Sequence, residues 1–118
     1  HAPNGVEDDL TAILDFGDCL ATIGTSFRSK MQNCAYLIGE DGYIAIPDFW
    51  RASECLLFEL DECKERFCDD RESIGLNFET QAVIDDLAAG LNASPVVSLN
   101  DSLAFQQMMA RIRDEFSR

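Results

Sequence analysis

The spacing of apolar residues changes once along this chain, and the change restricts the folds that it can adopt. In the first half, apolar and polar residues alternate in short runs, which is typical of strands with one buried face. From Phe78 onward, apolar residues recur every three or four positions, as on one face of a helix. Strands followed by helices predict an α+β fold, in which two helices cover one face of an open, mostly antiparallel sheet.

Three antiparallel hairpins are predicted in the first half. The turns of the first two contain Gly17-Asp18 and Asp41-Gly42, residue types that readily adopt the positive φ of tight turns. The predicted strand pairs are 10–16 with 19–27, 33–38 with 43–46, and 55–60 with 63–68. The third pair, with Asp61-Glu62 as its turn, alternates poorly, so an edge strand and a helix are both open there.

Two helices are predicted in the second half. Asn77 is the expected N-cap of the first helix, and Gly90 is expected to end it. Val96-Val97 is expected to be extended, and Ser98 or Asn100 is expected to cap the last helix. The apolar stripe of the first helix is Ile84, Leu87, Ala88 and Leu91, and that of the last is Phe105, Met108, Met109, Ile112 and Phe116.

The charge balance argues against two classes of partner. Nine basic and 22 acidic side chains give a formal net charge of −13, which repels nucleic-acid phosphates and anionic lipid. No apolar run reaches the roughly 18 residues of a membrane-spanning helix. The five cysteines follow no disulfide or zinc pattern, so reduced thiols and a cytoplasmic location are expected, although Cys63 and Cys68 could become neighbours across a turn.

Motifs for catalysis are missing from the sequence. It contains no GxGxxG or GxxxxGK[ST] phosphate loop and no GxSxG nucleophile elbow, and its single histidine is His1. Acidic pairs such as Asp69-Asp70 and Asp85-Asp86 are expected to be solvated charges. Trp50 follows a predicted strand and is expected to pack in the core or at an interface. The sequence therefore assigns no catalytic, cofactor-binding or metal-binding residue.

Several segments resemble one known family of oxidoreductases. Residues 39–47 read G-x-x-G-x-I-x-I-P, followed by Phe49 and Trp50, and resemble a hairpin of the Gfo/Idh/MocA family (glucose–fructose oxidoreductase, inositol dehydrogenase and relatives). Residues 75–83 and 90–95 are similar to that family's G-x-x-Y/F-E helix with its G-x-x-x-S-P ending. The similar segments run in order along nearly the whole chain, and they look most like the dihydrodiol and D-xylose dehydrogenase branch.

The resemblance implies a fold and a role. In this family an N-terminal Rossmann domain binds NAD or NADP, and a C-terminal domain carries a large open sheet that commonly forms the dimer interface and helps to wall the substrate pocket. Residues 1–118 are accordingly expected to be a single domain, the C-terminal sheet-forming portion of a larger NAD(P)-dependent oxidoreductase of sugars, inositols or diols. The family's glycine-rich loop, catalytic lysine and D-x-x-x-H segment find no counterpart, so the cofactor is expected in the full-length parent and not in this chain.

Two sets of residues follow as candidate sites. In relatives the loop before the G-x-x-Y/F-E helix can approach the substrate, which implies a pocket role for Asp69, Asp70, Arg71, Glu72 and Ser73. The second face of the sheet is expected to form a homodimer, through Ile13, Leu20, Thr22 and Trp50. Two alternatives stay open: a stand-alone protein-interaction domain that uses the free sheet face, and a small-ligand binder between sheet and helices.

Overall fold

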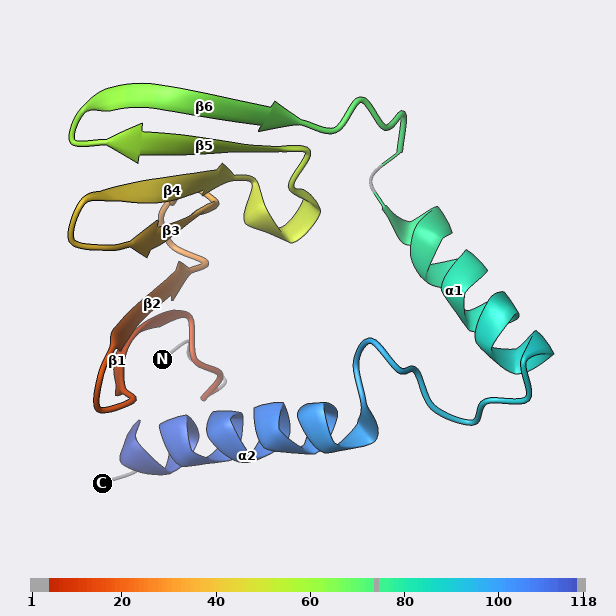
Figure 1. Ribbon diagram of the computed structural model, residues 1–118. Coiled ribbons are helices and arrows are strands. Elements are labelled where there is room, and N and C mark those ends of the chain that lie inside the picture. Colours follow the sequence, from red (N-terminus) through yellow and green to blue (C-terminus); the bar gives the residue numbers. More distant parts are fainter. Residues whose placement is uncertain (1–4, 74, 117–118) are drawn as a thin grey trace. The chain divides into compact units, whose positions relative to one another are not determined.

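The strands and helices of this protein lie in two separate parts of the chain (Figure 1). The computed structural model describes residues 5–73 and 75–116. Its contacts divide the chain into His1–Glu72, which contains the six described strands, and Ser73–Arg118, which contains both described helices. The α+β prediction is therefore confirmed, while coverage of one sheet face by the helices stays a prediction.

The first two strands form a hairpin of their own. β1 (Asp9–Asp15) pairs antiparallel with β2 (Leu20–Ser26). The turn requires glycine at Gly17, whose φ is 90°, and the Asp15 carboxylate accepts its N–H at 2.8 Å. The predicted alternation is confirmed in β1, where one face carries the half-buried Leu10, Ala12 and Leu14 and the other carries the exposed Thr11, Ile13 and Asp15.

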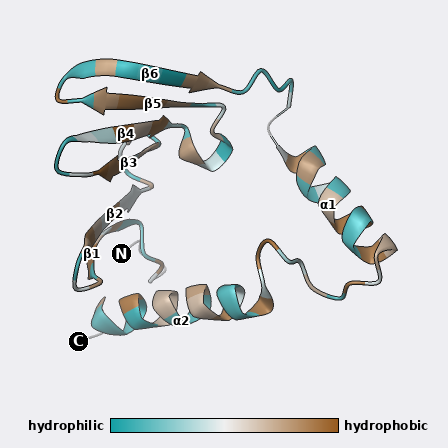
Figure 2. Ribbon diagram, viewed as in Figure 1, coloured by the Kyte–Doolittle hydropathy of each residue, from teal (hydrophilic) through white to brown (hydrophobic). Residues whose placement is uncertain are grey.

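The next four strands form a second antiparallel sheet in the order β3-β4-β5-β6. They are β3 (Cys34–Ile38), β4 (Gly42–Pro47), β5 (Glu54–Glu59) and β6 (Glu62–Cys68), with the short 3-10 helix η1 (Phe49–Arg51) between β4 and β5. Figure 2 shows hydrophobic residues along β3 and β5. Ala45 in the central strand β4 is the one buried residue of the described chain, at 7% exposed. Pairing between neighbouring strands therefore contributes much of the stability of this sheet.

The third predicted hairpin is confirmed as β5 and β6, and the helix alternative is wrong. The turn is formed by Leu60 and Asp61, one residue earlier than predicted, because Leu60 adopts a left-handed φ of 54°. β6 is an edge strand with a register shift against β5, which accounts for its poor alternation. Cys63 and Cys68 lie on this one strand, so the expectation that they could be neighbours across a turn is wrong.

The first helix, α1 (Leu76–Ala88), begins two residues before its expected start. The prediction of Asn77 as its N-cap is wrong, because the N-cap is Gly75, with a φ of 102° and no side-chain hydrogen bond to the helix. Glycine adopts that positive φ without the clash that a Cβ atom brings. The end of the helix is as predicted: Gly90 has a φ of 76°, and its N–H donates to the Leu87 carbonyl at 3.0 Å.

The second helix, α2 (Leu99–Phe116), begins with Ser98 as its N-cap, one of the two predicted positions. The Asp101 N–H donates to the Ser98 hydroxyl at 3.1 Å, and the Ser98 N–H donates to the Asp101 carboxylate at 2.9 Å. This reciprocal pair is a capping box. Val96-Val97, which was expected to be extended, lies in a bend instead, because its N–H groups donate to the Ser94 hydroxyl at 3.1 and 3.4 Å.

The capping box makes the start of α2 sensitive to pH. Hydrogen bonds from the hydroxyl and N–H groups of Ser98 lower the pKa of the Asp101 carboxyl below its ordinary value of 3.8. A lowered pKa in the folded state means that the cap is complete at neutral pH and is lost as the pH falls through that lowered value. Asp101→Asn is therefore expected to reduce the helical circular dichroism at pH 7, and to match the unmodified chain once the pH has fallen below the lowered pKa of Asp101.

The matched control for this prediction removes a carboxylate from the other end of the same helix. Asp114→Asn is expected to leave the helical signal at pH 7 unchanged or slightly higher, because a negative charge near the C-terminus opposes the helix dipole. Equal losses from the two variants would contradict the role of the capping box.

Candidate functional site

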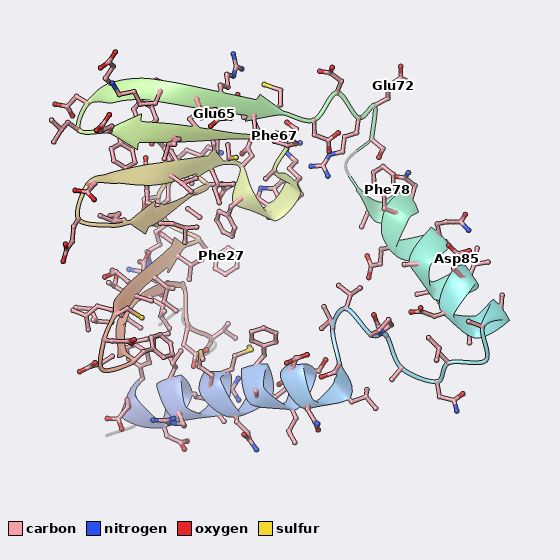
Figure 3. All side chains as sticks on the ribbon, viewed as in Figure 1. Phe27, Glu65, Phe67, Glu72, Phe78 and Asp85 are labelled. Carbon is pink, nitrogen blue, oxygen red and sulfur yellow. The ribbon has the colours of Figure 1, made fainter. Side chains whose placement is uncertain are left out.

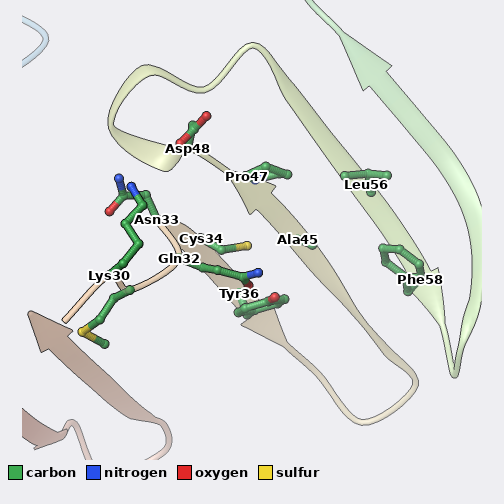
Figure 4. A pocket seen from close by; sticks show the side chains of 11 residues that line it. Lys30, Gln32, Asn33, Cys34, Tyr36, Ala45, Pro47, Asp48, Leu56 and Phe58 are labelled. Atoms are coloured by element: carbon green, nitrogen blue, oxygen red, sulfur yellow. The ribbon is translucent and has the colours of Figure 1, made fainter.

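One face of the four-stranded sheet is hollowed beside its central strands (Figure 4). The hollow has a volume of about 510 Å³. Its floor comes from the strands and consists of Tyr36, Ala45, Leu56 and Phe58, with Cys34 and Pro47 at the strand ends. Its rim comes from the segments that flank β3 and β4 and includes Lys30, Gln32, Asn33 and Asp48. An apolar floor inside a polar rim is the usual character of a ligand-binding surface.

The strand register places the floor residues on one face. Tyr36, Ala45 and Leu56 lie directly opposite one another in β3, β4 and β5, and Tyr43 lies opposite Phe58. Directly opposite residues in a sheet point to the same side. The rings of Tyr43 and Phe58 stack, with centroids 4.7 Å apart and planes 9° apart, and Tyr36 follows at 6.1 Å from Tyr43. The result is a row of three aromatic rings across neighbouring strands.

The Tyr36 phenol adds a polar group to this aromatic row. Its hydrogen bond with the Cys34 thiol, together with the charge that this thiol can carry, raises the pKa of Tyr36 above its ordinary value of 10.0. The phenol is therefore neutral under physiological conditions. A neutral phenol can both donate to and accept from a hydroxyl group of a ligand.

Asp48 fixes the rim through its backbone. It adopts the left-handed conformation, with φ 46° and ψ 45°, which is uncommon outside glycine. Its N–H donates to the Asn33 carbonyl at 2.6 Å, and its carbonyl accepts the Arg51 N–H at 2.8 Å. The first of these bonds ties the segment before β3 to the segment after β4, and the second closes the turn of η1. A strained residue held by its surroundings is a feature that clusters at binding sites.

Two of the predicted sites meet at η1. The Arg51 guanidinium lies over the Trp50 ring, 4.8 Å from its centroid. The Arg71 guanidinium donates to the Arg51 carbonyl at 2.9 Å and also to the Ala52 carbonyl. The predicted pocket loop is thereby anchored to the segment that carries the predicted interface tryptophan.

The other residues of the predicted pocket loop do not converge on one point. The Asp69 carboxylate pairs with the Arg71 guanidinium at 3.5 Å. Asp70 and Glu72 are exposed, and Figure 3 shows Glu72 in the loop after β6. Ser73 is half-buried. None of these residues lines the hollow, so the substrate-pocket role of the loop stays a prediction.

Three of the four predicted interface residues share one face of the β1–β2 hairpin. Ile13 and Thr22 are directly opposite each other, and Leu20 lies on the same face, opposite Asp15. Ile13 and Leu20 are each 69% exposed. Trp50 lies in η1, which connects β4 and β5 of the other sheet, and is 59% exposed. We call Ile13, Leu20 and Thr22 the hairpin patch; self-association through it stays a prediction.

Sequence reasoning missed Tyr36, Tyr43 and Phe58, because Tyr36 and Phe58 belong to no motif and Tyr43 fills a variable position of the 39–47 pattern. The signal that could have found them is the register of the second hairpin. Once the turn between Gly39 and Gly42 is accepted, period-2 alternation places Tyr36 and Tyr43 on one face. The position of Phe58 depends in addition on the pairing of β4 with β5, which no local pattern specifies.

Two other kinds of feature do not occur in the described part of the chain. Residues 5–73 and 75–116 contain no group of three or more histidine, cysteine, aspartate or glutamate side chains that could hold a metal ion. Neither described helix combines the length and the apolar character that crossing a membrane requires.

Comparison with known proteins finds relatives with one shared name. The chain is 30% identical over 122 residues to a trans-1,2-dihydrobenzene-1,2-diol dehydrogenase of Xenopus tropicalis, and 28% identical over 118 residues to one of Xenopus laevis. Each match covers 94% of this chain and 34% of the relative. The resemblance to the dihydrodiol dehydrogenases is confirmed. A third relative, from Oryctolagus cuniculus, is 26% identical over 117 residues, 92% of this chain and 36% of its own.

The homologues of this chain are thus dehydrogenases, and the chain spans about a third of their length. Because the matches cover 92–94% of the chain, its strands and its helices both correspond to one region of those enzymes. No protein-family model matches the sequence. No solved structure matches it either.

Proposed function

We propose that this chain is the C-terminal, sheet-forming domain of a longer NAD(P)-dependent oxidoreductase that acts on a sugar, an inositol or a diol. The observation that carries the proposal is the match of 94% of the chain to about a third of the dihydrodiol dehydrogenases. The rest of the protein supplies the nicotinamide cofactor and its hydride chemistry, because this sequence has no GxGxxG loop for the cofactor pyrophosphate.

The hollow suits a polyol as the substrate class. Such a molecule presents C–H groups on its faces and hydroxyl groups around its edge. Tyr36 and Phe58 offer an aromatic surface to the C–H face. Gln32, Asn33 and Asp48 offer donors and acceptors to the hydroxyl edge. In this proposal the sheet shapes the substrate site, and the loop 69–73, which does not line the hollow, stays a candidate for further substrate contact.

The cofactor part of the proposal is tested with the isolated chain. NADH and NADPH are expected to show no change in fluorescence on titration with the chain up to about 100 μM, since no phosphate cradle is present. Binding at micromolar cofactor would contradict the assignment. Reading the coding sequence upstream of His1 is a second test, which is expected to reveal a GxGxxG segment; an initiator methionine directly before His1 would count against a parent enzyme.

The hairpin patch, together with Trp50, is proposed to form an isologous homodimer. Light scattering is expected to give a mass of at least two chains over a range of concentrations. Ile13→Asp is expected to weaken this dimer by at least about tenfold, because it places a charge in an apolar interface. Val96→Asp makes the same change of charge at a residue that is 84% exposed in the other part of the chain, and it should have no effect. A monomer at every concentration would refute this role.

The exposed hairpin patch also favours a second function, a stand-alone protein-interaction domain. This alternative predicts a monomer that binds a different protein through Ile13 and Leu20. It predicts in addition that no cofactor-binding segment precedes His1 in the coding sequence. The two experiments above therefore separate it from the leading proposal.

A further inference from the structure

The four-stranded sheet has one protected edge and one open edge. At the protected edge, β6 carries several charged residues and a register shift against β5, two features that discourage further strand pairing. At the other edge, β3 contains no charge, no proline and no register shift, and β4 is its one partner among the described residues. Leu37 and Ile38 on β3 are 62% and 81% exposed. β3 therefore has the properties of an edge that accepts another strand.

Hydrogen bonds just outside β3 show which of its residues are hydrogen-bonded to β4 and which face the open edge. Before the strand, the Asn33 carbonyl accepts the Asp48 N–H at 2.6 Å. After the strand, the Gly39 N–H donates to the Gly42 carbonyl at 2.9 Å. Bonded and non-bonded residue pairs alternate along an antiparallel ladder, so these two pairs determine which residues between them are bonded to β4.

The alternation assigns Ala35 and Leu37 to the bonded pairs. Cys34, Tyr36 and Ile38 therefore direct their backbone N–H and C=O groups to the open edge. These three residues also have their side chains on the face that carries the hollow, because they lie opposite Pro47, Ala45 and Tyr43.

Charges beyond the two ends of β3 favour a second copy of this chain as the partner. Residues 31–39 are uncharged, whereas Lys30 precedes them and Glu40 and Asp41 follow them. When two copies pair antiparallel along β3, Lys30 of each copy meets the acidic turn of the other. Parallel pairing would bring like charges together. This attraction matters because the net charge of −13 otherwise makes two copies repel.

We propose that two copies of this chain join edge to edge through β3, with a twofold axis at Tyr36. Tyr36 then pairs with Tyr36 of the second copy, and Cys34 pairs with Ile38. Each pair exchanges two backbone hydrogen bonds, from the groups that point to the open edge. The two four-stranded sheets become one continuous sheet whose hollows lie on the same face. This contact uses a different surface from the hairpin patch proposed above, so chains that make both contacts assemble beyond two copies.

Tyr36→Cys tests the position of the axis. The Cα atoms of a bonded antiparallel pair are about 5.5 Å apart, within the roughly 4.4–6.8 Å that a disulfide spans. Oxidation of this variant with oxidised glutathione is expected to give a covalent dimer, with a 36–36 bond located by peptide mass mapping. Leu37→Cys is the matched control. Its side chain faces the opposite side, and in this register it lies opposite Ala35, so no 37–37 bond is expected.

Ile38→Cys tests the register with a cysteine that the chain already has. In the proposed pairing, position 38 of one copy lies opposite Cys34 of the other. Oxidation is therefore expected to give two reciprocal 34–38 bonds between the chains. A 34–38 bond within one chain is ruled out, because four residues of extended strand separate the two positions by about 13 Å.

Lys30→Glu tests the charge argument. Replacing attraction by repulsion at both ends of the seam is expected to weaken dimerisation through β3 by about three- to tenfold, measured as the yield of the 36–36 disulfide at limiting protein concentration. Lys64→Glu makes the same change of charge on the protected edge β6 and is expected to leave that yield unchanged. Equal effects of the two variants would remove the reason for antiparallel pairing.

Two outcomes would overturn the proposal. One is the absence of an interchain 36–36 bond from a Tyr36→Cys chain that keeps the circular dichroism of the unmodified protein. The other is a disulfide that joins position 36 to a cysteine of the same chain, which would show that another segment of that chain covers β3. Adding Ile13→Asp separates this contact from the hairpin patch, because the 36–36 bond is expected to survive the loss of a dimer formed through that patch.

Discussion

Gly42→Ala is expected to lower the free energy of unfolding of the strand-containing part by about 2–3 kcal/mol. Gly42 begins β4 and lies opposite Glu59 in β5. A Cβ atom here would overlap the Phe58 carbonyl oxygen and lie 3.2 Å from the Glu59 Cα atom. Both obstacles are backbone atoms, so they can move only if β4 and β5 separate. The fluorescence of Trp50, the one tryptophan of the chain, reports the loss as a lower midpoint of urea denaturation.

Gly39→Ala is the matched control for this prediction, because it adds the same methyl group at the other end of the same turn. The nearest atom to a Cβ at Gly39 is the Gly42 carbonyl oxygen at 3.7 Å, an ordinary contact distance. The change in the free energy of unfolding is expected to stay within about 0.5 kcal/mol. If the two variants were equally destabilised, the cause would be the lost glycine flexibility of the turn and not the close approach of β5.

Arg71→Ala is expected to release the loop after β6 at a cost of about 1–2 kcal/mol. The Arg71 guanidinium donates to the Arg51 and Ala52 carbonyls, and its side chain is only 20% exposed. Removing it leaves those carbonyls without their charged donor. Arg71→Lys keeps the positive charge but lacks the planar fork of donors, so it is expected to restore less than half of the loss.

Hydrogen exchange distinguishes release of this loop from a general loss of stability. The Asp69 N–H donates to the Ser53 carbonyl at 2.7 Å, next to the Arg71 anchor. Its exchange is expected to accelerate in Arg71→Ala, while exchange at Ala45 in the central strand changes less. Arg111→Ala, which removes an arginine from α2, should alter neither rate. An Asp69 amide that stays protected in Arg71→Ala would contradict the anchoring role.

The elements of the fold that could be predicted are those that depend on neighbours in the sequence. Period-2 alternation and the turn residues around Gly17 and Gly42 predicted the first two hairpins, and the structure confirms both. Gly90 marked the end of α1 and Ser98 the start of α2, since helix ends depend on a few adjacent residues. The start of α1 was assigned wrongly to Asn77. Asparagine is a common N-cap, but the N-cap is Gly75, and its positive φ cannot be read from the sequence.

The candidate site was predicted less completely, for a physical reason. Ile13 and Thr22 could be placed on one face of a hairpin because the alternation of side chains has a period of two. The aromatic row could not be assembled, since Phe58 reaches Tyr43 through the pairing of two separate hairpins. Arg71 was expected in a pocket loop, but its contacts are backbone carbonyls about twenty residues earlier.

The sequence by itself determined the α+β class, the turns of the first two hairpins and the resemblance to the dihydrodiol dehydrogenases. Each of these depends on residue types at short, regular spacings, which local sterics and hydrogen bonding convert directly into structure. The tertiary structure alone decided the hollow, the anchoring of the 69–73 loop by Arg71 and the open edge of β3. Those features depend on which strands pair and in which register. Backbone carbonyl and N–H groups are chemically the same at every position, so the sequence does not show which of them will meet.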